Sequence, residues 1–331
     1  MKPQAPRVLL LALEHSGALL FAVILVTFGI LQPRFLAPEN LVNILLQSSA
    51  TAIVAIGMTF VLVTAGVDLS VGALMFIGAS IAGRMALAGG SPLLVLPWMV
   101  GVGVIGGALN ALLVTRLGIL AFIATLGTLN AGRGLGLWIS QTRAMNLPDS
   151  FARLGAERWL GIPLPLLVLG ILTAIAHGVL QQTPFGRQLL AMGQNPEAAR
   201  KAGIPVRRHL AAAYMISGGC AGLGGVVALT QLGAVSPRFG EFYEFDAITA
   251  AVLGGTSLFG GRGNIFPGAL LGAVLVKSIF NGLVMLQADP YLFPMITSVI
   301  IFIAVLFDSL RRTWIARLRT RTVLPPPAPS V

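Results

Sequence analysis

Charged side chains are scarce in this sequence: only 10% of its 331 residues are Asp, Glu, Lys or Arg. Soluble chains carry about a quarter, so the composition excludes an ordinary soluble domain. Hydrophobic residues make up 56%, and apolar runs long enough to cross a bilayer recur along the whole length. The short alternating segments of a membrane barrel are absent. These features predict an all-α polytopic membrane protein.

Cysteine and lysine are also rare. Cys220 is the only cysteine, so no disulfide can form within the chain, and its apolar surroundings indicate a packing role. The three lysines are Lys2, Lys201 and Lys277, and none follows a glycine as the ATP-binding P-loop requires. Metal-ligand spacing of histidines and nucleophile motifs are missing too. We therefore expect no catalytic residue, no metal and no cofactor in this chain; if ATP drives it, another protein must bind the ATP and Mg²⁺.

The net charge of +11 raises the question of a nucleic-acid partner. The basic residues lie in short stretches between apolar runs and in the C-terminal tail, rather than on one face of a soluble domain. A nucleic-acid interface needs such a clustered face. We therefore exclude nucleic acid and expect the membrane as the main environment.

We predict one membrane domain over residues 1–331, with a membrane body over 16–308, a polar loop over 183–209 and a basic, Pro-rich tail over 309–331. The apolar runs predict ten membrane segments, roughly 16–32, 42–65, 69–88, 92–115, 118–140, 164–182, 210–232, 246–260, 265–286 and 291–308. If the N-terminus is cytoplasmic, the inner loops and tails carry 14 Lys or Arg and the outer loops carry six. The positive-inside rule then places both termini and the polar loop in the cytoplasm.

A helix of about two turns is predicted inside the polar loop. Asn195 can cap it, Pro196 suits its first position, and Gly203 can supply a left-handed stop. The charges at its two ends also match the helix dipole: Glu197, Arg200 and Lys201. One interpretation is an ordinary connecting loop; the other is a docking element that transmits mechanical work from a soluble partner to the membrane body.

Two membrane segments are unusually short, 247–260 and 69–83, and each lies beside a polar, Gly-containing turn. The letters DLSVGAL (68–74) align with NIFPGAL (264–270), which suggests two related halves. Paired short segments in corresponding halves indicate a transporter core. Candidate residues for its translocation path are Gln47, Thr64, Asp68, Ser70, Arg133 and Asn264. GxxxG spacings, Gly103/Gly107 and Gly218/Gly222 among them, predict close packing within the bundle or between subunits.

Three ionisable residues lie in or beside apolar runs, and the role of each can be interpreted in two ways. Asp68 can be a proton or cation site of a secondary transporter, or it can cap the following helix by accepting from the N–H of Ser70 or Val71. Arg133 and Lys277 can line a water-filled path, or they can snorkel or pair with other groups. The favoured interpretations are capping for Asp68 and snorkelling or pairing for Arg133 and Lys277.

Four motifs resemble a known family: GMTFVLVTAGVDLSVG (57–72), FIATLGTLNAGRGL (122–135), TPFGRQLLAMGQNPEAARKAGI (183–204) and FDAITAAVLGGTSLFGGRGNIFPGALLGA (245–273). They are similar to the permease subunit of bacterial ABC importers for monosaccharides, the ribose, xylose and arabinose permease family. The resemblance implies a ten-helix, cobalamin-permease-like fold of the bacterial inner membrane. It also implies three partners: a second permease copy, a cytoplasmic ATPase and a periplasmic sugar-binding protein.

The resemblance gives the predicted short helix its role as the coupling helix, which fits a groove on the ATPase through Glu197, Ala198 and Ala199. The coupling residues that it implies are Gly186, Asn195, Pro196, Glu197, Ala198, Ala199, Arg200 and Gly203. A nucleoside or autoinducer-type solute stays open as the substrate. A secondary transporter that uses Asp68 for protons is the rival of a different class, although such a transporter does not need the helix at 196–202.

The predicted outer loop 233–246 is acidic and aromatic. Such a surface suits docking of a binding protein through opposite charge and aromatic anchors. The candidate docking residues are Arg238, Glu241, Tyr243 and Glu244. The alternative is a solvated loop whose aromatic rings lie at the level of the lipid headgroups.

Overall fold

The computed structural model describes residues 16–296, 298–300, 302–303 and 306. They form a bundle of helices with two small two-stranded sheets, of which only one is a hairpin. The helices are α2 (Ser16–Leu31), η1 (Pro33–Leu36), α3 (Pro38–Leu62), α4 (Val71–Leu87), α5 (Pro92–Thr115), α6 (Ala121–Ser140), α7 (Asp149–Ala156), α8 (Leu164–Gln182), α9 (Pro184–Gln194), α10 (Pro196–Lys201), α11 (Val206–Leu232), α12 (Tyr243–Leu253), η2 (Ile265–Ala269) and α13 (Leu270–Met285). Strand β1 (Met145–Asn146) pairs with β4 (Ala234–Val235), and β2 (Arg158–Trp159) pairs with β3 (Ile162–Pro163).

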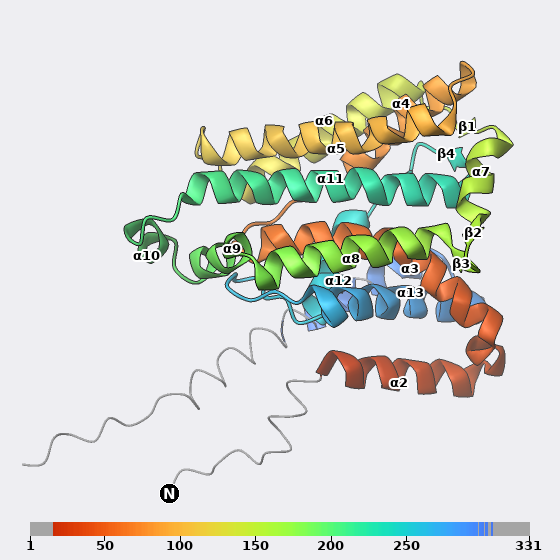
Figure 1. Ribbon diagram of the computed structural model, residues 1–331. Coiled ribbons are helices and arrows are strands. Elements are labelled where there is room, and N and C mark those ends of the chain that lie inside the picture. Colours follow the sequence, from red (N-terminus) through yellow and green to blue (C-terminus); the bar gives the residue numbers. More distant parts are fainter. Residues whose placement is uncertain (1–15, 297, 301, 304–305, 307–331) are drawn as a thin grey trace, which may run out of the picture.

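The long helices lie side by side, as Figure 1 shows, with α10 projecting from one end of the bundle and α7 and the strands at the other. We call these the α10 end and the α7 end. Within the described residues, α3, α5, α8, α11 and the continuous run Ile265–Met285 are long and apolar enough to cross a membrane. The predicted all-α polytopic membrane protein is therefore confirmed.

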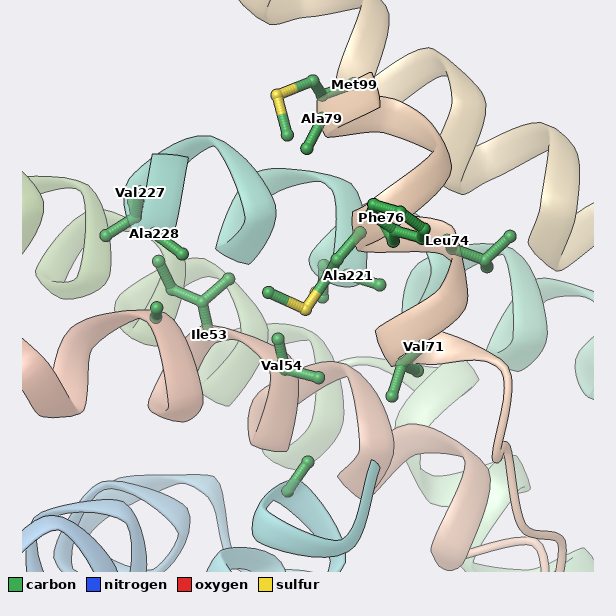
Figure 2. Packing of buried hydrophobic residues seen from close by; sticks show 14 of the residues in the cluster. Ile53, Val54, Val71, Leu74, Phe76, Ala79, Met99, Ala221, Val227 and Ala228 are labelled. Carbon is green, nitrogen blue, oxygen red and sulfur yellow. The ribbon is translucent and has the colours of Figure 1, made fainter. Parts of the chain in front are cut away.

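Helix α3 lies at the centre of the bundle, and its residues from Ser48 to Leu62 are buried. Small and β-branched side chains dominate this stretch, so neighbouring helices can approach it from several sides. Figure 2 shows side chains from α3, α4 and α11, among them Ile53, Phe76 and Ala221, gathered in one apolar cluster. This cluster fixes the position of the polar turn between α3 and α4.

The Gly ladders on α5 and α11 bring the two backbones together. A Cβ at Gly103 would collide with the carbonyl of Gly218, and a Cβ at Gly218 would collide with the carbonyl of Gly103. Gly107 and Gly222 are equally close to the facing backbone. The prediction that these ladders pack within the bundle is confirmed.

Several predicted boundaries change. Helix α12 has 11 residues and ends at Leu253 rather than near 260, because a turn follows in which Gly255 has a φ of +94°. Helix α11 begins at Val206, four residues before the predicted segment, and so includes His209. Three helices were not predicted: η1, α7 and α9. Part of the predicted segment 291–308 and the whole tail 309–331 lie outside the described residues.

Candidate coupling and translocation sites

The two short helices at the α10 end are both capped by side chains. Thr183 Oγ1 accepts the N–H of Gly186 at 3.3 Å and begins α9. Asn195 Oδ1 accepts the N–H groups of Glu197 and Ala198 at 3.1 and 3.0 Å and begins α10. Gly203 follows with a φ of +81°, which favours glycine. The predicted cap, short helix and stop are confirmed.

Most coupling residues that the sequence implied are exposed on α10: Asn195, Pro196, Glu197, Ala198 and Arg200. Two others correct the expectation. Ala199 is only 4% exposed and packs toward the bundle, so its side chain does not face a partner. Gly186 is buried, and a Cβ there would collide with the carbonyl of Leu180. Both residues hold α9 and α10, which we call the α9–α10 unit, against the bundle, because α9 folds back on α8.

The end of α9 touches the turns that follow α3 and α12. The N–H of Gly261 donates to the carbonyl of Val63 at 2.8 Å, so the two turns are joined directly. Gln194 Nε2 donates to the carbonyl of Gly261 at 3.4 Å. A Cβ at Gly193 would collide with the Val63 carbonyl and with the Gly261 nitrogen. The end of α9 is therefore in direct backbone contact with both polar turns.

Asp68 is completely buried in the turn between α3 and α4 and bonds to side chains of α5 and α11. Its Oδ1 accepts the N–H and hydroxyl of Ser70 at 3.1 and 2.7 Å and the Asn110 amide at 3.3 Å. Its Oδ2 accepts the hydroxyl of Ser217 at 2.8 Å. Asn110 on α5 also donates to the Ser70 hydroxyl at 2.7 Å and accepts from Thr128 on α6 at 2.8 Å.

The predicted bond from the Ser70 N–H to Asp68 is confirmed, but the helix-capping role is not. Helix α4 begins at Val71, so Ser70 occupies the cap position and Asp68 lies two residues before it. The carboxylate instead closes a local turn and collects donors from α5 and α11. Sequence reasoning missed Asn110 and Ser217, although Asn110 is the single amide in an otherwise apolar helix.

Arg133 on α6 is paired, which is one of the two arrangements favoured from the sequence. Its Nη1 donates to the carbonyl of Phe239 at 2.6 Å, and its guanidinium lies 5.5 Å from the centroid of the Phe76 ring. A Cβ at Gly72 would meet both the Glu244 carboxylate and the Arg133 guanidinium. Opposite charges therefore face each other across the start of α4.

The prediction that Glu244 lies on an acidic outer surface is wrong, because this residue is only 5% exposed. Helix α12 begins at Tyr243, so its first turn carries Glu244 into the bundle. Tyr243 is half-buried and lines a pocket. Of the docking candidates, the exposed Arg238 and the half-buried Glu241 remain, and Arg238 donates to Glu241 at 2.5 Å.

Lys277 on α13 is also paired. Its Nζ lies 2.8 Å from Asp246 Oδ2 and 5.3 and 5.2 Å from the ring centroids of Tyr243 and Phe280. The pair borders a pocket of about 750 Å³. Its lining residues come from α3, the start of α12, α13 and the segment after α13: Gln47, Glu241, Phe242, Tyr243, Phe245, Asp246, Lys277, Phe280, Phe293, Pro294, Ser298 and Phe302.

The translocation-path candidates do not form one site. Asp68 and Ser70 share a network, Arg133 borders Phe239, and Gln47 lines the pocket. Thr64 donates to the carbonyl of Val61 at 2.7 Å and so satisfies the end of its own helix. The N–H of Asn264 donates to Thr256 Oγ1 at 3.3 Å, just before η2. Thr64 and Asn264 thus belong to the two turns that α9 contacts.

Known proteins resemble the chain over nearly its whole length. The ribose import permease protein of Haemophilus influenzae is 34% identical over 302 residues, which cover 90% of this chain and 93% of the relative. The D-allose transport system permease protein of Escherichia coli is 37% identical, with 90% and 92% covered. The fructose import permease protein of Rhizobium meliloti is 34% identical, with 89% and 83% covered.

No solved structure matches the chain. Residues 40–306 match the family described as the permease component of the branched-chain amino acid transport system. This match includes nearly all of α3 and the chain on to α13, and hence both polar turns, the α9–α10 unit and the whole lining of the pocket. The chain is therefore a multi-pass membrane protein that belongs to this family of transport permeases.

Proposed function

We propose that this chain is the membrane permease subunit of an ABC importer for a monosaccharide in the bacterial inner membrane. The relatives named above carry the names of sugars. The observation that carries the proposal is the exposed, capped helix α10, whose neighbour α9 contacts both polar turns. Such a helix gives a soluble ATPase a contact point on a chain that has no P-loop.

In this proposal ATP and Mg²⁺ are bound by a cytoplasmic ATPase, and a periplasmic binding protein delivers the sugar. Two permease copies of ten helices each, with a cobalamin-permease-like arrangement and two related halves, enclose the path. Both termini and the α10 end face the cytoplasm, in agreement with the basic residues of the α10 end, Arg187, Arg200, Lys201, Arg207 and Arg208.

The residues of this chain convert displacement of α10 into movement of the membrane body. ATPase closure displaces α10, and α9 carries the displacement to Val63 and Gly261 by direct contact. These turns immediately precede α4 and the η2–α13 run, so both helix starts shift together. Packed interfaces switch between discrete arrangements, which suits an alternation between outward-open and inward-open states.

Charge reversal on α10 tests the proposal. In cells that express the complete importer, Glu197→Lys should abolish sugar uptake while the permease still accumulates in the membrane, because Glu197 is exposed and a positive charge opposes the helix dipole. Glu157→Lys is the matched control, since Glu157 is also exposed but lies between α7 and β2, at the α7 end. Normal uptake by the Glu197 variant would refute ATPase docking at α10.

Competition identifies the substrate class in the same assay. Ribose and D-allose should compete with the transported solute, whereas leucine and a nucleoside should not. Competition by leucine alone would return the substrate to the amino-acid class that the family description names.

A further inference from the structure

The pocket beside the Lys277–Asp246 pair has no role in the coupling described above. It combines six aromatic rings with an ion pair and the polar side chains of Gln47, Glu241 and Ser298. Its volume of about 750 Å³ lies within the range of small-molecule sites, roughly 300–1,000 Å³. Both features point to a bound solute rather than to simple packing.

The ion pair is the first reason to assign a ligand. Asp246 is 6% exposed and lies in the membrane body, where a charge is costly unless it serves a function. Lys277 has three N–H donors, and Asp246 takes one of them at 2.8 Å. The remaining donors and the second carboxylate oxygen are hydrogen-bonding groups beside an apolar cavity.

The lining restricts the class of ligand. Because Lys277 and Asp246 neutralise each other, the pair offers no net charge to an anion. A lipid tail needs no ion pair. A monosaccharide has hydroxyls that match charged hydrogen-bonding groups and an apolar ring face that packs on aromatic side chains such as Phe280 and Tyr243.

We propose that this pocket binds the monosaccharide during passage, with Lys277 and Asp246 bonding its hydroxyls and the rings of Tyr243 and Phe280 packing on its face. The inference rests on the proposed function, since it names the substrate-binding residues of that importer. It assigns a sugar site to the permease itself, separate from that of any binding protein.

Cysteine protection tests the site on the full-length permease alone, purified into lipid nanodiscs. Cys220 is buried, so Cys220→Ala removes the native thiol with little change in packing. Gln47→Cys and Ser298→Cys report from the pocket, and Ser91→Cys reports from an exposed position outside it. Ribose or D-allose should slow alkylation of both pocket thiols and leave the thiol at position 91 unchanged.

An aromatic substitution checks that the protection comes from binding in this pocket. Phe280→Leu should raise the sugar concentration needed for half-protection by about tenfold, as expected for the loss of an aromatic anchor, and Phe280→Tyr should restore it. If sugar protects neither pocket thiol, or if leucine protects both equally, the site is refuted.

The pocket thiols can also react slowly without sugar and faster once each nanodisc holds a single copy. That result would show that a second permease copy fills the pocket, and it would also refute the sugar site. Sugar uptake in cells separates the two proposals. Uptake without protection would overturn this site alone, whereas absence of ATP-driven uptake would overturn the importer.

Discussion

Replacing Gly193 by alanine tests the contact between α9 and the two polar turns most sharply. The added Cβ would meet the Val63 carbonyl and the Gly261 nitrogen, which are backbone atoms that no rotamer change can move away. The helix end must therefore shift by about 1 Å, the scale at which packing contacts are lost. Overpacking of this kind costs about 1–3 kcal/mol, and strain on the Gly261–Val63 hydrogen bond adds up to about 1 kcal/mol.

We expect the Gly193→Ala variant to fold with a lowered melting temperature. We also expect it to uncouple ATP hydrolysis from transport, so that less sugar is imported for each ATP hydrolysed. The assay is the ratio of sugar imported to ATP hydrolysed in vesicles that hold the complete importer. Gly178→Ala is the matched control, because Gly178 lies near the end of α8 and a Cβ there meets nothing within 4 Å. An unchanged ratio in the Gly193 variant, with the control also unchanged, would show that the contact transmits no motion.

Further predictions concern the buried acids and the outer pair. Asp68→Asn should keep uptake and near-normal yield, since the amide oxygen still accepts from Ser70. Asp68→Ala should lower the melting temperature, because each buried donor left unpaired costs about 1–3 kcal/mol. Loss of uptake in a well-folded Asp68→Asn variant, together with wild-type uptake that depends on a proton gradient, would contradict this. Glu241→Lys should weaken ATPase stimulation by the binding protein at low salt only, because it removes the partner of the exposed Arg238 and reverses a charge near the surface. Equal stimulation across a salt titration would remove Glu241 from the docking surface. Glu244→Lys should instead reduce yield, since it places a second positive charge beside Arg133 in the bundle; full yield would contradict the buried placement.

Features set by neighbouring residues could be predicted from the sequence. The cap of α10 is such a case, since Asn195, Pro196 and Gly203 act within one short stretch. The membrane helices were also predictable, because bilayer thickness fixes the length of an apolar run. Segment ends were less so: α12 ends early at a glycine turn, and α11 continues into a polar stretch that hydropathy does not mark as helix.

The site itself depends on contacts between distant residues. Asp68 is hydrogen-bonded to Ser217, which lies 149 positions away in the chain, and no local sequence pattern links the two residues. Glu244 was expected at the surface because it lies in the acidic, aromatic stretch predicted as an outer loop, but the early start of α12 turns it inward. The bond between the turns, from Gly261 to Val63, involves backbone atoms only, so no side-chain motif could reveal it.

The most direct measurement is uptake of radiolabelled sugar into vesicles that contain the permease, its ATPase and external binding protein. The proposed coupling predicts uptake that requires ATP on the side of the membrane where the ATPase is bound and that persists when the proton gradient is collapsed. Uptake should be lost in Glu197→Lys but not in Glu157→Lys. Uptake by the permease alone, driven by a proton gradient and abolished by Asp68→Asn, would contradict it.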